Sequence, residues 1–148
     1  MRFGLIVMMA GLGLLTGGVQ PARAASVDGY SVANLNIRSG PSARFPSVGV
    51  LGAGTVVTVH GCVSRYRWCD VSASGIRGWT SGGQIQIIDD ERSVYLPSRT
   101  GAVWVPEITF EINSYWRDHY RDHDFYGDAE DWDDYDWEDD GPPLGWDD

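Results

Sequence analysis

Cys62 and Cys69 are the residues whose chemistry is easiest to anticipate. In an oxidising compartment an isolated cysteine pair is usually a disulfide. A metal site is the alternative, but a bare Cys-x6-Cys spacing lacks the two further ligands that zinc requires. A disulfide closing so short a loop would stabilise the fold by roughly 2–3 kcal/mol on the chain-entropy estimate. We therefore expect a structural crosslink without a redox function.

The histidines offer weaker chemistry. His119 and His123 would lie at i and i+4 on a helix expected near residues 113–121, a spacing used for metal ligation. No third ligand is identifiable, so we expect no metal site and no cofactor. His60 stands alone in a strand pattern and is interpreted as a surface residue. No nucleophile lies beside a base in this chain, which argues against an enzyme.

Residues 123–148 form an acidic, aromatic segment whose spacing invites a calcium interpretation. Residues 136–141 imitate the first half of an EF-hand loop, but Pro142 and Pro143 occupy its middle, so we expect no EF-hand. Repulsion between the acids predicts a disordered tail. The aromatic residues between the acids suggest the alternative of a docking segment for a basic protein partner, or for the protein's own arginines: Trp132, Tyr135, Trp137 and Trp146.

Tyr66, Trp68 and Trp79 are the strongest candidates for contact with a ligand. Cys69 is expected to face the core, which turns Trp68 toward solvent on the opposite face of its strand. Exposed tryptophan usually packs on a neighbour or meets a ligand, because its area is costly to leave in water. The three rings therefore suggest a patch that stacks on a peptide or glycan. The alternative is that residues 93–116 cover the three rings, which would then form a small buried core of their own.

Arg38 is the fourth candidate, at the end of a strand and before the turn residues Ser39, Gly40 and Pro41. Its guanidinium could hold loop carbonyls or the carboxylate of a ligand. We favour the structural role, because a planar fork of donors satisfies several loop acceptors at once.

The elements that must position these residues are short strands. Residues 33–38 alternate apolar and polar, and residues 55–59 are β-branched, with turn signals between such segments. This pattern predicts an all-β fold, a small barrel or sandwich, over residues 28–90. Strict alternation would turn Cys62 away from Cys69, so we predict a β-bulge at Gly61 that lets the sulfurs meet.

Residues 91–122 are expected to form an extension that packs on or beside the β-rich domain. Ile108, Phe110 and Ile112 alternate with polar residues and predict one more strand. A short helix should follow, capped by Asn113 or Ser114.

Residues 1–24 have the features of a secretory signal peptide. Residues 3–15 are apolar but too few to span a bilayer, and Ala22-Arg23-Ala24 matches the signal-peptidase pattern. We expect cleavage after Ala24 and a periplasmic or extracellular protein without a membrane span; a short membrane anchor is the alternative. The formal net charge is −10, and loss of Arg2 and Arg23 would lower it by two, to −12. Such a polyanion is not expected to bind nucleic acid.

Much of the β-rich region resembles the bacterial SH3 (SH3b) domain. The resemblance covers about residues 29–88 and depends most on one octet, Leu35-Asn-Ile-Arg-Ser-Gly-Pro-Ser42. Softer matches are Gly54-Thr-Val-Val-Thr-Val59, Trp68-Cys-Asp-Val71 and Arg77-Gly-Trp79. Thr80 and Gln84-Ile85 depart from the usual pattern, and the second departure removes an aromatic residue from the possible groove.

The resemblance implies an SH3-like barrel of five to seven short strands, here followed by an extra strand, a short helix and the disordered tail. It also implies non-catalytic binding of cell-wall peptide, peptidoglycan or an envelope protein. Recognition of proline-rich peptides, as in eukaryotic SH3 domains, is not implied. The expected function is therefore a binding module of the bacterial cell envelope. The alternatives are a regulatory protein acting through its acidic tail and a cell-wall hydrolase accessory.

Overall fold

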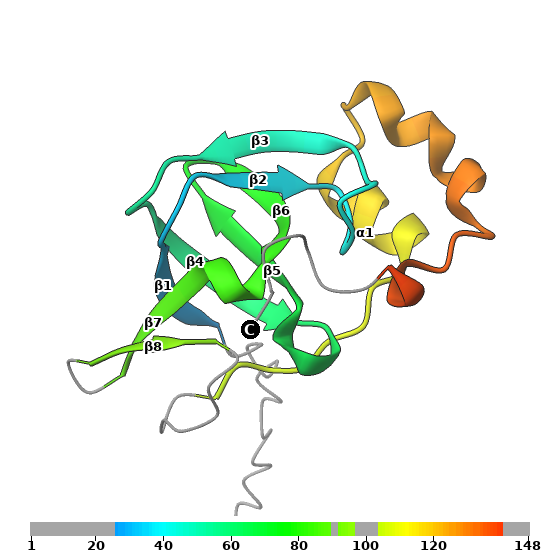
Figure 1. Ribbon diagram of the computed structural model, residues 1–148. Helices are drawn as coiled ribbons and strands as arrows, with labels where there is room; N and C mark the ends of the chain where they lie inside the picture. Colours follow the sequence, from blue (N-terminus) through cyan, green and yellow to red (C-terminus); the bar gives the residue numbers. More distant parts are fainter. Residues whose placement is uncertain (1–25, 90–91, 97–103, 141–148) are drawn as a thin grey trace, which may run out of the picture.

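The computed structural model describes residues 26–89, 92–96 and 104–140, and its main element is one antiparallel sheet of eight strands (Figure 1). The strand order is β3-β2-β6-β5-β4-β1-β7-β8. The strands are β1 (Val27–Ser31), β2 (Leu35–Arg38), β3 (Ser47–Leu51), β4 (Val56–Cys62), β5 (Trp68–Ala73), β6 (Ile76–Ser81), β7 (Ile85–Asp89) and β8 (Arg92–Tyr95).

This sheet confirms the predicted all-β, SH3-like fold. The first seven strands cover residues 27–89, close to the expected range of 28–90, and β8 pairs with β7 beyond it. The sheet is open, because β3 and β8 end the strand order and no ladder joins them within the described residues. No helix in the described part of the chain is long and apolar enough to cross a bilayer. The expected signal peptide and its cleavage site lie outside the described residues.

The main core follows the strand alternation seen in the sequence. β2 buries Leu35 and Ile37 and exposes Asn36, while β4 buries Val57 and Val59. Each such aliphatic side chain contributes about 1.5–3 kcal/mol when it leaves water. The buried cluster comprises Leu35, Ile37, Leu51, Val57, Val59, Cys62, Cys69, Val71, Ile85, Ile87, Leu96 and Val105.

The predicted bulge at Gly61 is confirmed. Val59 pairs with Val71 and Gly61 pairs with Asp70, so His60 is the extra residue of β4. The register change brings Cys62 opposite Cys69, and the two form a disulfide. A bulge moves the following side chains to the other face of the strand, which is what the crosslink requires.

Beyond β8, the described part of the extension meets the sheet through a parallel bridge between Cys62 and Glu107. The Cys62 N–H donates to the Pro106 carbonyl at 2.9 Å, and the Ile108 N–H donates to the Cys62 carbonyl at 2.8 Å. The predicted strand over residues 108–112 is wrong, because no neighbouring strand lies beside residues 108–111 among the described residues. The strand added after β7 is β8 instead.

Helix α1 (Ile112–His119) confirms the short helix but not its predicted cap. Glu111 is the N-cap: its carboxylate accepts from the backbone N–H of Asn113 at 2.9 Å and of Ser114 at 2.7 Å. Such bonds satisfy N–H groups that have no partner within the helix. Hydrogen bonds from Ser114 and then Asn113 hold the pKa of Glu111 below its ordinary value.

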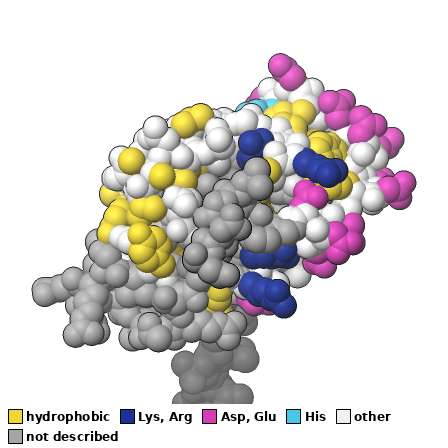
Figure 2. Space-filling view, in the orientation of Figure 1, with side chains coloured by type: hydrophobic (Ala, Val, Ile, Leu, Met, Phe, Trp, Pro, Cys, Tyr) yellow, Lys and Arg dark blue, Asp and Glu magenta, His cyan; other side chains and the backbone are white. Residues whose placement is uncertain are grey.

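The expectation of a disordered tail is wrong for residues 124–140, which form the 3₁₀ helices η3 (Asp124–Trp132) and η4 (Trp137–Asp139). Phe45 stacks on Trp132 with ring centroids 4.4 Å apart and meets Tyr135 edge-on at 5.5 Å. The aromatic residues thus supply an apolar face that packs on Phe45 in the β2–β3 connection, while Asp128, Asp131 and Asp134 are exposed. Asp140 instead faces the domain, where its carboxylate accepts a hydrogen bond from the Ser42 hydroxyl. Figure 2 shows the acidic side chains gathered on this side of the molecule.

Candidate functional site

Trp68 and Trp79 are buried, with exposed fractions of 6% and 0%. Trp68 faces away from the main core, as predicted, and Trp79 does the same, but the extension and the tail cover that face. The side chains that pack against them are Ile108, Phe110 and Trp137. The predicted exposed patch is therefore wrong, and the alternative holds that the two rings belong to a small buried core of their own. The expected cover lay within residues 93–116, whereas Trp137 from the tail also belongs to it.

Tyr66 and Arg38 are also used inside the protein. The Tyr66 hydroxyl donates to the Val105 carbonyl at 3.2 Å, and Nη1 of Arg38 donates to the Phe45 carbonyl at 2.9 Å. The Arg38 contact fits the structural role favoured from the sequence, in which its guanidinium holds a loop carbonyl. Arg38 lies opposite Trp79 in the β2–β6 ladder, but the four predicted residues do not form one open surface.

A buried polar network, which the sequence analysis missed, joins the sheet to α1. Asp70 accepts from Nε and Nη2 of Arg77 at 2.7 and 2.6 Å and from the Tyr115 hydroxyl at 2.6 Å. The Tyr120 hydroxyl donates to the Arg77 carbonyl at 2.8 Å. Burial, and then the charge of Asp70, raise the pKa of Tyr115, so its hydroxyl stays protonated. One signal was available: apart from Asp28, Asp70 is the sole acid in residues 28–88.

The histidines do not form the geometry that the sequence allowed. α1 ends at His119, so His123 lies beyond the helix and the i, i+4 relation is lost. His60 shares a 2.8 Å hydrogen bond between its Nε2 and the Ser72 hydroxyl. Within the described residues, no group of three or more histidine, cysteine, aspartate or glutamate side chains is placed to hold a metal.

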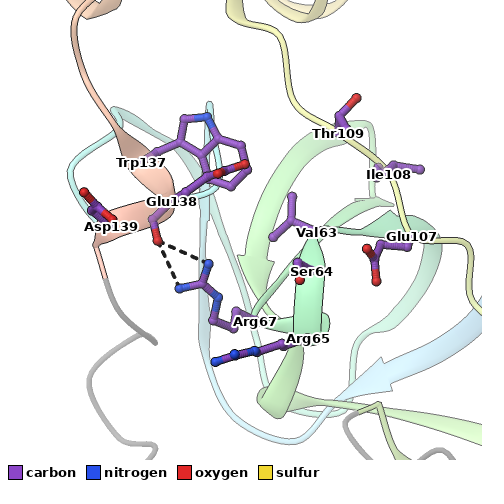
Figure 3. Close-up of a pocket in the computed structure, with 10 residues that line it drawn as sticks. All are labelled: Val63, Ser64, Arg65, Arg67, Glu107, Ile108, Thr109, Trp137, Glu138 and Asp139. Carbon is purple, nitrogen blue, oxygen red and sulfur yellow. Dashed lines mark hydrogen bonds between the residues drawn. The ribbon is translucent and has the colours of Figure 1, made fainter.

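A charged cleft of about 480 Å³ opens where the β4–β5 connection, residues 107–109 and the tail meet (Figure 3). Residues 63–67 form its floor, and the extension and η4 form opposite walls. The residues that line it are Val63, Ser64, Arg65, Arg67, Glu107, Ile108, Thr109, Trp137, Glu138 and Asp139.

The floor of this cleft has an unusual backbone. The 3₁₀ turn η1 (Ser64–Tyr66) includes Arg65 at φ 63° and Tyr66 at φ 56°, both in the left-handed region. Such a conformation costs a residue other than glycine about 1–2 kcal/mol, so the surrounding structure must impose it. The turn gives the floor a fixed shape and places Arg65 at the edge of the cleft.

Charged groups of both signs are available in the cleft. Nη1 and Nη2 of Arg67 both donate to the Glu138 carbonyl at 3.3 Å, and this contact ties the tail to the floor. The side chains of Arg65 and Glu107 make no hydrogen bond or ion pair with any other described residue. The arrangement can therefore bind a ligand through charge.

Sequence reasoning missed the cleft residues because three separate segments form the cleft. Two arginines flanking Tyr66 between predicted strands were the single signal available. Glu107 and Trp137 reach the cleft through the bridge at Cys62 and the packing of the tail. Neither contact follows from a sequence pattern.

The fold and the cleft define a small β-rich binding module. Residues 33–91 match the family model described as the bacterial SH3 domain, so this part of the chain is a bacterial SH3 domain. No curated protein and no solved structure matches the chain. The match ends at residue 91, so the floor of the cleft belongs to the matched domain and both walls belong to residues that follow it.

Proposed function

We propose that the protein is a non-catalytic binding module of the bacterial cell envelope and that its ligand is a cell-wall peptide bound in the charged cleft. The observation that carries this proposal is the cleft itself, with Arg65 and Glu107 available to a ligand. The match to a domain family whose members bind cell-wall ligands supports it. The disulfide and the expected signal peptide over residues 1–24 support the location.

A pull-down with purified cell-wall sacculi tests this function. The wild-type protein should sediment with sacculi, and Arg65→Gln combined with Glu107→Gln should remain in the supernatant. Arg117→Gln combined with Glu130→Gln is the matched control, because both residues are exposed and lie outside the cleft. Absence of wild-type binding, or equal binding of both double variants, would reject the proposal.

A second function is favoured by the outer face of the tail. Residues 128–136 direct their aromatic side chains inward, while Asp128, Asp131 and Asp134 are exposed. We propose this face as a docking surface for a basic envelope protein. Fluorescence anisotropy with an arginine-rich peptide as the probe tests it: the triple Asp→Asn variant should lose the salt-dependent binding. Unchanged binding by the triple variant contradicts it.

A further inference from the structure

We infer that the cleft binds an amphoteric peptide end, with the ligand's carboxylate against Arg65 and its ammonium group between Glu107 and the acids of η4. This inference depends on the proposed function, because it assumes that the cleft is the ligand site. It adds the chemical class of the ligand and assigns each charge a place.

The place for a carboxylate follows from the floor. Arg65 is held in a left-handed turn that glycine would adopt without strain, and its guanidinium makes no hydrogen bond or ion pair with any other described residue. A guanidinium presents a fork of donors that matches a carboxylate, and such paired hydrogen bonds are stronger than neutral ones. Arg67 adds a second positive charge, although the Glu138 carbonyl occupies its terminal nitrogens.

The place for an ammonium group follows from the walls. Glu107 is fixed by the two backbone hydrogen bonds that join its neighbours to Cys62, itself crosslinked to Cys69. On the opposite wall, the Glu138 N–H donates to Oδ1 of Asp136 at 3.1 Å, which caps η4. Both walls are therefore anchored before a ligand arrives, and anchored groups lose little entropy on binding.

The charge balance of the cleft favours a ligand with an excess of ammonium groups. Its lining includes three carboxylates, from Glu107, Glu138 and Asp139, against the guanidiniums of Arg65 and Arg67. Trp137 lines the same wall as Glu138 and offers an aromatic surface to an aliphatic stem or a cation (Figure 3). A lysine-like residue with a free carboxylate offers the carboxylate to Arg65, an ammonium group to the acids and an aliphatic stem to Trp137.

The test compares one peptide with its charge-neutralised forms. The probe is Ala-Ala-Lys with a free carboxylate, and the two others carry a C-terminal amide or acetylated amines. When each peptide is titrated into the protein, the backbone amide NMR signals of residues 63–67 and 107–109 should shift. We expect amidation and acetylation each to weaken binding about tenfold, which is typical of losing a charge-assisted contact.

Variants assign each charge of the probe to its partner. Arg65→Gln should bind the free and amidated peptides equally, and Glu107→Gln should bind the free and acetylated peptides equally. Arg117→Gln and Glu130→Gln should behave like the wild type, as exposed residues outside the cleft. Circular dichroism of each variant establishes that it is folded.

The outcomes separate this inference from the proposed function. One outcome is that the double variant Arg65→Gln, Glu107→Gln no longer binds sacculi, while amidation and acetylation leave peptide binding unchanged. In that case the ligand class is overturned and the function stands. If the peptide binds with the expected charge dependence but sacculi do not, the inference stands and the function falls. Absence of binding in both assays overturns both.

Discussion

The Tyr115 hydroxyl donates a 2.6 Å hydrogen bond to Oδ1 of Asp70, a carboxylate on β5 that is only 3% exposed. The same carboxylate receives two N–H groups from Arg77 on β6. One buried acid thus links the SH3 domain to α1 of the extension. Buried carboxylates are stable only when several donors satisfy them, so the docking of α1 and the folding of the sheet are coupled.

The first prediction concerns this link. Tyr115→Phe removes one donor to a charged acceptor and should lower the free energy of unfolding by about 1.5 kcal/mol. Asp70→Asn leaves Arg77, whose side chain is 29% exposed, without its counter-charge and should cost about 2–3 kcal/mol. Urea unfolding followed by tryptophan fluorescence measures both. Arg117→Gln is the control, because its pairing with Asp118 is exposed on both sides. Equal stability of Tyr115→Phe and the wild type would contradict the link.

The second prediction compares two fully buried indoles. Nε1 of Trp116 donates to the Ser39 carbonyl at 2.9 Å, whereas Nε1 of Trp79 has no partner among the described residues. Both changes to phenylalanine lose similar volume, but only Trp116→Phe also loses a hydrogen bond. Trp116→Phe should therefore cost about 1 kcal/mol more than Trp79→Phe, measured by chemical denaturation. The opposite ranking would show that the Trp79 nitrogen is paired in solution.

A third prediction tests the contact between the bulge and the extension. A Cβ at Gly61 would lie 2.6 Å from Cγ2 of Ile108, so Gly61→Ala should cost about 1–3 kcal/mol through overpacking. Gly52→Ala is the matched control, since the nearest atoms to its Cβ would be 4.0 Å away. Adding Ile108→Ala should recover part of the loss, because it removes the clashing atom. Strict additivity of the two changes in a double-mutant cycle would show that Ile108 does not pack there.

The disulfide gives a fourth prediction. Replacing Cys62 and Cys69 together by alanine should lower the free energy of unfolding by about 2–3 kcal/mol, because the crosslink restricts the unfolded chain. Glu107 is bridged to Cys62, so the same variant should also bind cell-wall sacculi less well. Thermal unfolding and the sacculi pull-down measure these effects. Reduction of the wild type should reproduce them, and a reduced protein as stable as the oxidised one would count against the prediction.

The fifth prediction concerns pH. Burial, and then the charge of Arg77, lower the pKa values of His60 and His119, while the charge of Asp70 opposes this. The folded state therefore binds fewer protons than the unfolded state as the pH falls through the ordinary histidine range, so stability is lost on acidification. The double variant His60→Gln, His119→Gln should lose less stability than the wild type between about pH 7.5 and about pH 5. Parallel curves of melting temperature against pH would refute this role.

The features of the fold that could be predicted from the sequence were local ones. Alternation in β2 and β4 identified four residues of the main core, Leu35, Ile37, Val57 and Val59, and the positions of the cysteines required a bulge, for which Gly61 was the natural place. These inferences succeeded because strand periodicity and the reach of a disulfide are short-range constraints. The octet beginning at Leu35 also indicated the bacterial SH3 domain that residues 33–91 match, before any contact was known.

The candidate site depended on contacts that the sequence did not reveal. Trp68 was correctly placed on the outer face of its strand, yet whether solvent, a ligand or the chain itself covers that face depends on residues far along the sequence. Likewise, the aromatic residues near Trp132 could have been solvated among their acids, but Phe45 offers them a surface on which to pack.

The sequence by itself therefore determined a β-rich, disulfide-linked domain and the core residues of its strands β2 and β4. Only the tertiary structure decided that Trp68 and Trp79 are covered and that Arg65 and Glu107 share a cleft. The physical reason is that periodicity specifies which face of a strand is apolar, whereas the partner of that face is set by long-range packing.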